Sequence, residues 1–469
     1  MHQGLMDQLR QIVGEAGILS SREVAERSAA TGRPGALRAE ALVRPRSTAE
    51  VSAVLRACHA VRQPVVVHGG LSGLVRGTDA AAHELILSLE RMDRIEEIDP
   101  VSRTATVQAG VKLQALQEAV EEKGLMFPLD LGARGSATLG GNIATNAGGN
   151  RVVRYGMMRE MVLGVEAVLA DGTVVSALNR LIKNNSGYDL KHLFIGSEGT
   201  LGVVTRAVLR LRERPRGHHV SLAGVERFDA VVGLLRQMDQ ALGGQLSAFE
   251  VMWREHYDLV THPPAASVSP LAGQHAFYVL IESHGADAPP DAMVAALEVA
   301  SAAGLVADAV VARSQAERNA LWAIRDDVGQ LRRFAPILAF DVSLPIAAME
   351  EYAGGVRSRL AARWPGAHCS VFGHLADGNV HFVFAPGTGD AETRQAVEEI
   401  VYAPLAAVGG AISAEHGIGL EKKPWLPVSR TPEEIALMRL LKSALDPLGI
   451  LNPGKVVDAI SAARPPPRA

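Results

Sequence analysis

Residues 128–150 read PLDLGARGSATLGGNIATNAGGN and interrupt every regular hydrophobic period around them. Two further glycine-rich stretches lie nearby: residues 68–78, HGGLSGLVRGT, directly after the strand-like PVVV, and residues 196–202, GSEGTLG. Glycine lets backbone N–H groups approach an anion and adopt left-handed conformations that aim several of them at one point. One such loop alone is more typical of a turn, but three together predict a cofactor that carries phosphate.

The common phosphate-binding motifs are absent from the chain. No G-x-G-x-x-G follows a predicted strand, so the dinucleotide-binding Rossmann motif is excluded. No G-x-x-x-x-G-K-[ST] is present either, which excludes a P-loop nucleotide hydrolase. Generic motifs therefore leave the type of cofactor undecided.

Length and composition indicate a globular enzyme. At 469 residues, with 48% hydrophobic and 21% charged residues, the chain predicts two or three domains. A formal net charge of −4 without a basic stripe argues against nucleic-acid binding. Two cysteines, Cys58 and Cys369, form no CxxC pair and indicate neither a disulfide framework nor a thiolate metal site. The first residues lack the apolar core of a secretory signal, and no run of about 18 apolar residues occurs. We expect a cytoplasmic protein, with peripheral attachment to a membrane as the alternative.

Local periodicity predicts mixed secondary structure. We expect helices within residues 5–30, a helix capped by Ser47 and ending near Ala60, strands at 64–67, 85–89 and 104–111 with a turn at Asp99–Pro100, a helix over 111–124 closed by Gly124, a hairpin over 162–178 turning at Asp171–Gly172, and a last helix ending at Asp446. Strands and helices alternate over residues 216–410, which predicts an antiparallel sheet with helices on one face.

Residues 373–381 read GHLADGNVH and place two histidines seven positions apart. The Asp-Gly-Asn between them does not suit a helix, so we expect a tight turn with His374 on one strand and His381 on the other. Neutral imidazole is the commonest metal ligand, and two across a hairpin can approach one ion. A third candidate ligand, Glu415, stands next to His416 in SAEHGIG. Taken alone, a histidine pair of this kind is more often structural.

The order of the motifs resembles one family closely. The matching segments are RPRSTAEV at 44–51, PVVVHGGLSGLVRG at 64–77, DPVSRTATVQAGV at 99–111, the glycine-rich stretch at 128–150, VRYG at 153–156, LADGTVV at 169–175, NNSGYDLKHLFIGSEGTLGVVT at 184–205, GHLADGNVH at 373–381, AEHGIG at 414–419 and LNPGK at 451–455. Together they resemble the FAD-linked 2-hydroxy-acid dehydrogenases, which include D-2-hydroxyglutarate dehydrogenase, D-lactate dehydrogenase and the FAD subunits of glycolate oxidase. The resemblance runs from about residue 40 to residue 456.

This resemblance implies an α+β fold. The expected architecture is a two-subdomain PCMH-type FAD-binding domain, of the kind found in vanillyl-alcohol oxidase and p-cresol methylhydroxylase, followed by an antiparallel-sheet cap domain and a C-terminal return to the flavin. The expected boundaries are an N-terminal helical segment at 1–37, the FAD-binding domain at 38–215, the cap with a metal site at 216–420, and the C-terminal segment at 421–469.

The resemblance also implies where FAD binds. Residues 68–74 would form the pyrophosphate loop, 128–149 would surround the isoalloxazine and the phosphates, 196–204 would hold the adenine end, and the C-terminus would return to the flavin. Some relatives attach FAD covalently through a histidine where this chain has Leu71, so we predict non-covalent FAD. The residues expected to bind FAD are His68, Gly69, Gly70, Leu71, Ser72, Gly73, Leu74, Pro128, Asp130, Gly140, Gly141, Asn142, Thr145, Asn146, Gly148, Gly149, Arg151, Gly156, Gly196, Glu198, Gly199, Gly202, Val203, Val204, Asn452 and Lys455.

The resemblance assigns the catalytic chemistry as well. His374, His381 and Glu415 match the ligands of a divalent metal, zinc or manganese, and His416 matches the active-site base. Arg325 matches an arginine that binds the substrate carboxylate with its guanidinium fork. The implied reaction removes the hydroxyl proton and passes the Cα hydrogen to the flavin as hydride, so that a 2-hydroxy acid becomes a 2-oxo acid.

The chain departs from the hydroxyglutarate-specific members at three polar substrate contacts. Gly329 stands in place of a threonine, Ala339 in place of a lysine and Val383 in place of an asparagine. A distal carboxylate would be desolvated there without a partner, at a cost of several kcal/mol. We therefore expect a D-lactate-like or longer apolar D-2-hydroxy acid as substrate. Arg332 and Arg333 offer cations at a shifted position and keep D-2-hydroxyglutarate as the alternative.

Partners are only outlined by the resemblance. Electrons would pass to a separate acceptor, such as an electron-transfer flavoprotein, a quinone or a cytochrome, and a homodimer is one expected assembly. A second reading is a metal-free oxidase or dehydrogenase for another alcohol. A third is an FAD subunit of a glycolate-oxidase-like complex that serves mainly assembly or electron transfer.

Overall fold

A computed structural model describes residues 3–30, 33–285 and 290–460. The chain forms two compact units. Unit 1 comprises residues 1–147, 157–214 and 415–469, and unit 2 comprises residues 148–156 and 215–414. The domain limits expected at residues 38, 216 and 421 stay predictions.

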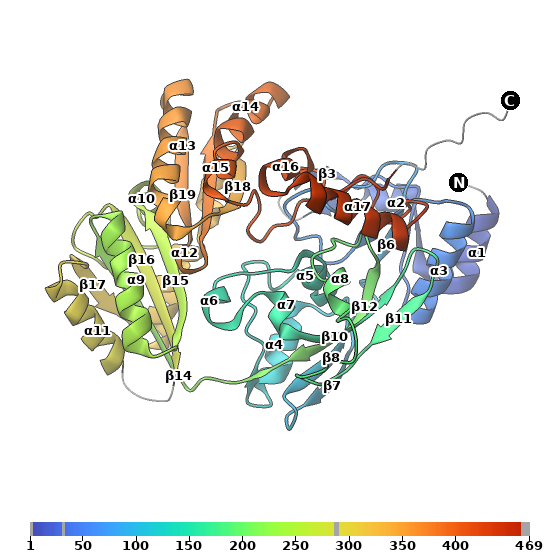
Figure 1. Ribbon diagram of the computed structural model, residues 1–469, viewed down its shortest axis with the longest axis horizontal. Coiled ribbons are helices and arrows are strands. Elements are labelled where there is room, and N and C mark those ends of the chain that lie inside the picture. The colour runs from blue at the N-terminus through green and yellow to red at the C-terminus, as the bar shows by residue number, and fades with distance from the viewer. Residues whose placement is uncertain (1–2, 31–32, 286–289, 461–469) are drawn as a thin grey trace. The chain divides into compact units, whose positions relative to one another are not determined.

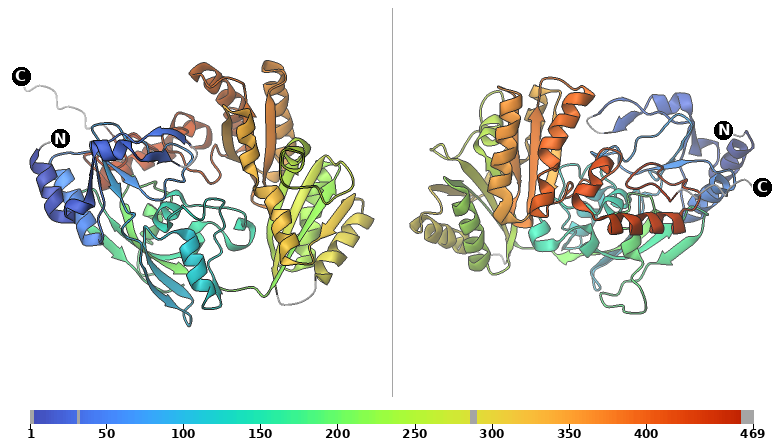
Figure 2. Two further views of the ribbon diagram at one scale, coloured as in Figure 1. Left: turned by 180° about the vertical axis from the view of Figure 1, so that it is seen from behind. Right: turned by 45° about the horizontal axis from the view of Figure 1, so that its top comes forward.

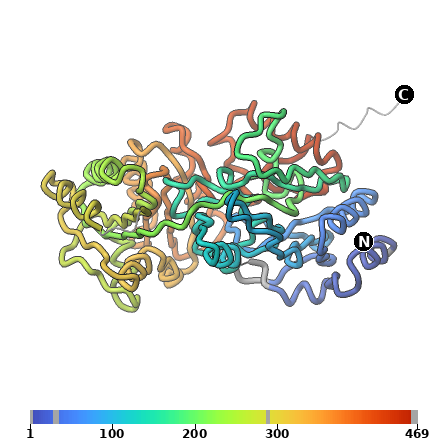
Figure 3. Tube along the Cα trace, turned by 90° about the horizontal axis from the view of Figure 1, so that it is seen from below, coloured from blue at the N-terminus to red at the C-terminus, as the bar shows by residue number. Residues whose placement is uncertain are grey.

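Unit 1 is built on two main sheets. Its helices are α1 (Gln3–Val13), η1 (Glu15–Gly17), α2 (Ser21–Ala25), α3 (Thr48–Ala60), α4 (Leu113–Glu121), α5 (Leu139–Thr145), α7 (Met158–Met161), α8 (Lys191–Phe194), η5 (Lys423–Trp425), α16 (Leu426–Ser429) and α17 (Pro432–Leu445). Its strands are β1 (Ile18–Ser20), β2 (Ser28–Ala30), β3 (Arg33–Ala36), β4 (Ala41–Val43), β5 (Val65–His68), β6 (Leu85–Ser88), β7 (Ile95–Asp99), β8 (Thr104–Gln108), β9 (Leu125–Met126), β10 (Val162–Val168), β11 (Val174–Ala177), β12 (Val203–Arg210) and β13 (Arg212–Glu213). One sheet has the order β1-β4-β6-β5 and the other the order β11-β10-β12-β8-β7. Figure 3 shows the C-terminal segment in red returning to this unit, which also holds the blue N-terminal residues.

Local signals explain several elements of unit 1. Ser47 accepts a hydrogen bond from the Glu50 N–H at the start of α3, as the sequence predicts. Gly124 follows α4 with a φ of 73°, and Gly172 turns the β10–β11 hairpin with a φ of 86°. The expectation of helices over residues 5–30 holds for α1, η1 and α2 but is wrong for β1 and β2. β1 instead pairs antiparallel with β4 at the edge of the first sheet. Long-range pairing overrides local propensity at this point.

Unit 2 is built on one seven-stranded sheet (Figure 1). Its strands are β14 (Gly217–Val225), β15 (Leu246–Trp253), β16 (Phe277–Gly285), β17 (Asp308–Val311), β18 (Leu338–Ser343), β19 (His368–His374) and β20 (Asn379–Ala385), in the order β17-β14-β16-β15-β19-β20-β18. Every pairing is antiparallel, as predicted for the cap. Its helices are α6 (Val152–Tyr155), α9 (Phe228–Leu242), α10 (Arg254–Thr261), α11 (Asp291–Ala302), α12 (Gln315–Asp326), η2 (Val328–Phe334), η3 (Ile346–Ala348), α13 (Met349–Arg363), η4 (Leu375–Asp377), α14 (Ala391–Tyr402) and α15 (Leu405–Val408).

Helices cover both faces of this sheet rather than the one face expected. Leu321 of α12 packs with Leu280 and Phe372 on one face. Phe228 of α9 contacts the ring of Trp253, whose side chain points to the other face because strand side chains alternate. Figure 2 shows α13 and α14 side by side, and α13 also packs on the sheet. Nearly continuous burial along β15, unlike the half-buried alternation of a one-sided sheet, accounts for the difference.

Within the described ranges, no helix is both long and apolar enough to cross a bilayer.

Candidate active site

The loop after β5 packs so tightly against the start of α5 that two of its residues must be glycine. A Cβ on Gly69 would lie 2.6 Å from the Thr138 hydroxyl oxygen, and one on Gly70 would overlap the Ser136 carbonyl oxygen. Thr138 Oγ1 and Asn142 Nδ2 are buried, and neither has a hydrogen-bond partner in the part of the chain that the structure describes. Buried polar atoms normally find a partner, so this glycine cradle fits a polar ligand such as a pyrophosphate.

His68 closes the same loop instead of pointing a charge at a ligand. Its Nε2 lies 2.9 Å from the Thr78 carbonyl oxygen. Burial lowers the pKa of His68 to about 4, so the ring is neutral near pH 7 and donates its Nε2–H to Thr78. Leu71, at the position where some relatives attach the flavin, has a φ of 55° in the left-handed region.

Asn452 joins the C-terminal segment to strand β5 and to the glycine-rich stretch 196–202. Its amide oxygen accepts from the Val67 N–H at 2.8 Å, and its amide nitrogen donates to the Glu198 carbonyl oxygen at 2.5 Å. Lys442 of α17, which is also buried, donates to the carbonyl oxygens of Thr200 and Leu451. Within unit 1, one hydrogen-bond network therefore ties together β5, the residues around 198–200 and the C-terminal segment.

Glu198 has a role that sequence reasoning missed. Residues 196–204 were expected to hold adenine through backbone contacts, but the Glu198 carboxylate accepts from the backbone N–H groups of Ile418 (2.7 Å) and Gly419 (2.8 Å). Burial raises the pKa of Glu198, against the opposing effect of these two hydrogen bonds. The side chain thus holds the HGIG turn directly after His416.

The remaining expected FAD contacts lie mainly around α5. A Cβ on Gly140 would meet the Ala109 Cβ at 2.6 Å, which explains the glycine there by close packing. Asn146 ends α5 in the left-handed region and accepts from the Arg159 N–H. Arg151 belongs to unit 2, where its guanidinium binds both carboxylate oxygens of Glu282 at 2.9 and 3.2 Å. Contact of these residues with FAD stays a prediction.

The hairpin predicted from HLADGNVH is present. β19 ends at His374, η4 and Gly378 form the turn, and β20 carries His381 on the neighbouring strand. Gly378 has a φ of 82°, which explains the glycine in this turn. The ring centroids of His374 and His381 lie 5.3 Å apart, and both residues are buried. The two imidazoles therefore meet on one face of the sheet.

A fully buried carboxylate connects His374 with Arg325. Glu250 of β15 is paired with His374 in the sheet, and its Oε1 lies 2.7 Å from His374 Nδ1. Its Oε2 accepts from Arg325 Nε of α12, also at 2.7 Å. Burial alone would raise the pKa of Glu250, but His374, Arg325 and the hydrogen bonds outweigh it and lower the pKa. Glu250 is therefore a carboxylate that accepts a hydrogen bond from His374 Nδ1, and when the His374 ring is neutral its Nε2 carries the lone pair.

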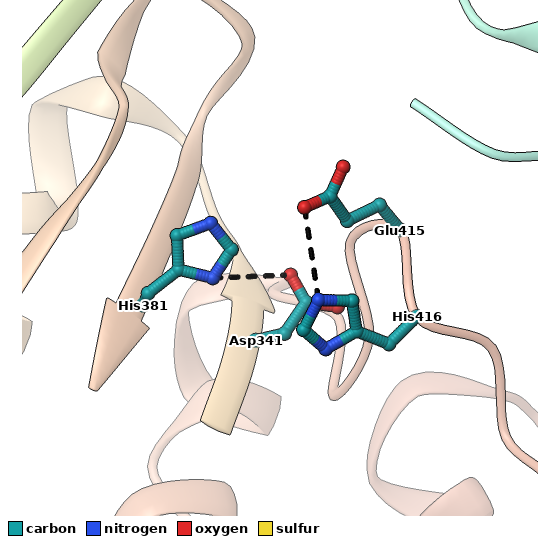
Figure 4. Close-up of side chains that lie close together, drawn as sticks. All are labelled: Asp341, His381, Glu415 and His416. Atoms are coloured by element: carbon teal, nitrogen blue, oxygen red, sulfur yellow. Dashed lines mark ion pairs between the residues drawn. The ribbon is translucent and has the colours of Figure 1, made fainter. Parts of the chain in front are cut away.

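A second buried acid, Asp341, lies beside His381 (Figure 4). Asp341 stands opposite His381 in the β18–β20 pairing, with 3.8 Å between its Oδ1 and His381 Nδ1. It accepts from the Asn379 side-chain amide at 2.9 Å and from the Ala414 N–H at 3.1 Å. Glu415 is bonded directly to Ala414, so it follows this anchored residue into the same place.

Four potential metal ligands gather here. One ligand atom from each of Asp341, His381, Glu415 and His416 lies within 4.8 Å of the others. His416 Nε2 and Glu415 Oε1 are 3.7 Å apart (Figure 4). This group contains two of the three expected ligands, His381 and Glu415, together with the expected base. It has Asp341 where the expected set has His374.

Sequence reasoning did not single out Glu250 and Asp341. Each is a single acidic residue within an otherwise largely apolar strand, LSAFEVMW and LAFDVS. This pattern is the feature of the sequence that could have identified them. A buried acid in such a strand needs a cation or hydrogen-bond donors beside it. Which partners it finds depends on the neighbouring strands, and these are distant in sequence.

Comparison with known proteins identifies the family. Residues 39–178 match the FAD binding domain, and residues 214–456 match the C-terminal domain of FAD linked oxidases. The chain belongs to the FAD-linked oxidase family. It is 42% identical over 420 residues to mitochondrial D-2-hydroxyglutarate dehydrogenase of Bos taurus, covering 89% of this chain and 76% of the relative.

Two further relatives are named for different substrates. This chain is 41% identical over 429 residues to D-2-hydroxyglutarate dehydrogenase of Xanthomonas citri pv. viticola, covering 90% of each chain. It is 36% identical over 427 residues to a putative mitochondrial D-lactate dehydrogenase of Schizosaccharomyces pombe, covering 88% of this chain and 81% of the relative.

Solved structures share its fold. p-Cresol methylhydroxylase superposes with a TM-score of 0.76 at 16% identity, covering 98% of each chain. Alkyldihydroxyacetonephosphate synthase superposes with a TM-score of 0.75 at 17% identity, covering 97% of this chain and 86% of the other. The expected PCMH-type α+β fold and the expected FAD binding are thereby confirmed.

Proposed function

We propose that this FAD-linked oxidase is a divalent-metal-assisted dehydrogenase that oxidises a D-2-hydroxy acid to the 2-oxo acid and passes the electrons to a separate acceptor. The observation that carries the proposal is the gathering of Asp341, His381, Glu415 and His416, with ligand atoms within 4.8 Å of one another. The names of the relatives, D-2-hydroxyglutarate and D-lactate dehydrogenases, support this class of substrate.

The donor set fits a zinc or manganese ion. Imidazole nitrogen and carboxylate oxygen are ligands of both metals. We assign His374, His381 and Glu415 as ligands, because the Glu250 hydrogen bond to His374 Nδ1 leaves Nε2 for a metal. Asp341 already accepts hydrogen bonds from neighbouring groups, which suits it to supporting His381. A bound divalent ion would act as a Lewis acid that lowers the pKa of the substrate hydroxyl.

Arg325 is well placed to bind a substrate carboxylate. Its Nε is held by Glu250, and its Cζ lies 4.9 Å from the centroid of the Phe372 ring. Among the described residues, no hydrogen bond donated by its Nη atoms is found. A guanidinium fixed at Nε and by its ring contact can offer both Nη groups to a carboxylate at little entropic cost.

His416 is the base in this proposal. It stands next to Glu415, and the following residues, Ile418 and Gly419, are held by Glu198. A neutral imidazole there accepts the hydroxyl proton while the Cα–H bond of the substrate breaks. A bound FAD would supply the two-electron oxidation, so that the Cα hydrogen can leave the substrate with its electron pair. The proton and the hydride together balance conversion of the CH–OH group into C=O.

The tail of the substrate is proposed to be small or apolar. Val383 packs in an apolar cluster with Phe372 and Ile324, and a distal carboxylate would have no partner within that cluster. D-2-hydroxyglutarate is the second candidate, favoured by the names of the relatives at about 40% identity. It would need a cation from Arg332 or Arg333 of η2.

The acceptor and assembly remain proposals from the family resemblance. An electron-transfer flavoprotein, a quinone or a cytochrome would take the electrons, and a homodimer or a glycolate-oxidase-like complex would be the assembly. Activity of the purified chain with an artificial dye acceptor would show that no partner subunit is needed for the chemistry.

Anaerobic flavin reduction tests the proposal. The purified yellow protein is mixed with D- and L-lactate, longer D-2-hydroxy acids and D-2-hydroxyglutarate, and the flavin absorbance is followed. Bleaching by a D-isomer, lost on chelation and restored by zinc or manganese, is the expected result. No bleaching with any compound would refute the proposed activity. Bleaching that survives complete removal of metal would refute the proposed role of a divalent metal in the reaction.

A further inference from the structure

We propose that Glu250 is a positioning residue that couples the metal site to the substrate-binding arginine. The inference rests on the proposed function and adds a residue that carries no chemical step itself. One carboxylate bridges the two parts of the site: Oε1 to His374 Nδ1 and Oε2 to Arg325 Nε, both at 2.7 Å.

The bridge determines which nitrogen of His374 can bind a metal. A carboxylate only accepts hydrogen bonds, so His374 carries a proton on Nδ1, and in the neutral ring that a metal would bind the lone pair is on Nε2. Metal-binding histidines generally use this arrangement, and loss of the supporting carboxylate typically costs 10- to 100-fold in metal affinity or activity. Glu250 is fully buried, so bulk water does not reach its place in the intact protein.

The same carboxylate orients Arg325. A guanidinium is planar, so a hydrogen bond at Nε sets the plane in which the two Nη groups lie. The Phe372 ring, 4.9 Å from Cζ, packs against that plane. One side chain, Glu250, therefore holds the proposed metal ligand His374 and the guanidinium of Arg325 at a fixed separation. Such a fixed separation is needed if the metal chelates a 2-hydroxy acid while Arg325 binds its carboxylate.

Glutamine at position 250 cannot reproduce this bridge. Both Arg325 Nε and His374 Nδ1 donate to Glu250, but an amide offers one acceptor and one donor. Arginine cannot accept, so the amide oxygen must face Arg325 and the amide N–H must face His374. His374 would then accept at Nδ1 and carry its proton on Nε2, the nitrogen assigned to the metal.

Glu282 provides a matched control in the same sheet. It is equally buried, on β16, and binds Arg151 through both oxygens. It also accepts from Trp322 of α12 and pairs with His218, and His284 lies close by. These residues form a second group of potential ligands, but the carboxylate already has close donors at both oxygens. Glu282→Gln disturbs a buried arginine–glutamate pair without touching His374.

The experiment compares Glu250→Gln and Glu282→Gln with the unmodified FAD-loaded protein. After chelation, zinc and manganese affinities are measured separately by competition with a chromophoric chelator. The His374 tautomer is followed by nitrogen NMR of histidine-labelled protein, with a His374→Gln sample for assignment. Glu250→Gln should bind metal 10- to 100-fold more weakly and move the His374 proton to Nε2. It should also raise KM, whereas Glu282→Gln should leave the metal affinity within about twofold.

Three results would overturn the inference: unchanged metal affinity in Glu250→Gln, an unchanged tautomer, or an equal loss of metal affinity in Glu282→Gln. If Glu250→Gln does not fold, Glu250→Asp replaces it. That shorter acid keeps the charge but cannot reach both partners, and it should show a loss of metal affinity or a raised KM. An unmodified protein that reduces its flavin without binding zinc or manganese would refute the proposed metal instead.

Discussion

Asn452→Ala should destabilise unit 1 and loosen its glycine-rich loops. The change removes the acceptor for the Val67 N–H and the donor to the Glu198 carbonyl oxygen. A buried backbone group left unpaired costs about 1–3 kcal/mol, so the two together cost about 2–6 kcal/mol. Asn452 has a φ of 41°, and alanine in the left-handed region adds about 1 kcal/mol. The expected total loss is about 3–7 kcal/mol.

Urea unfolding and hydrogen exchange measure this effect together. The unfolding midpoint gives the loss of stability, and exchange in a peptide covering Val67 tests whether its amide has lost its acceptor. A peptide from β7 serves as the internal reference. Asn452→Gly loses the same two hydrogen bonds without the left-handed strain, so it should recover part of the loss. A loss of unfolding free energy below about 1 kcal/mol for Asn452→Ala, with unchanged hydrogen exchange at Val67, would refute the reasoning. Asn452 would then not be the residue that holds β5 and the residues around Glu198 to the C-terminal segment.

Three further predictions concern single side chains. Lys442→Ala leaves Asp446 buried without its 2.5 Å partner and should cost about 3–5 kcal/mol of unfolding free energy, whereas the double change with Asp446→Asn should recover part of it. The pKa of His68 is lowered from 6.5 to about 4, so the unfolded chain binds more protons between these values, and stability should fall by about 3 kcal/mol as the pH drops through that window. A His68→Gln variant, which can still donate to Thr78, should lose this part of the fall in unfolding free energy between pH 6.5 and about 4. If the unfolding free energy of the variant falls as steeply as that of the unmodified protein, the prediction is wrong. His416→Ala should abolish anaerobic flavin reduction and keep FAD bound, and loss of FAD from this variant would place the residue elsewhere.

Several elements follow from a few neighbouring residues. The Ser47 cap predicts the start of α3, and Gly378 predicts the turn between β19 and β20, because capping and turn chemistry act over three or four positions. The stretch 5–30 shows the limit of this reasoning. Its residues Ile18–Ser20 form a strand only because β4 lies beside them, and no local pattern contains that information.

The candidate site divides in the same way. His374 and His381 were predictable as a facing pair, since one tight turn joins their strands. Binding of FAD by Arg151 stays a prediction, whereas the pairing of its guanidinium with Glu282 of β16, more than a hundred positions away, was not predictable from the sequence. A long, charged side chain is directed by the nearest buried opposite charge, and only the folded chain determines which charge that is.

The sequence by itself determined the glycine-rich loops, the histidine hairpin and the family to which the chain belongs, because each of these is written in short contiguous motifs. Only the tertiary structure decided that Glu250 faces His374 and that Asp341 faces His381. Those pairs depend on the register of strands brought together from distant parts of the chain. Register is a cooperative property of the whole seven-stranded sheet, since a slip of one residue would turn every one of these side chains to the opposite face.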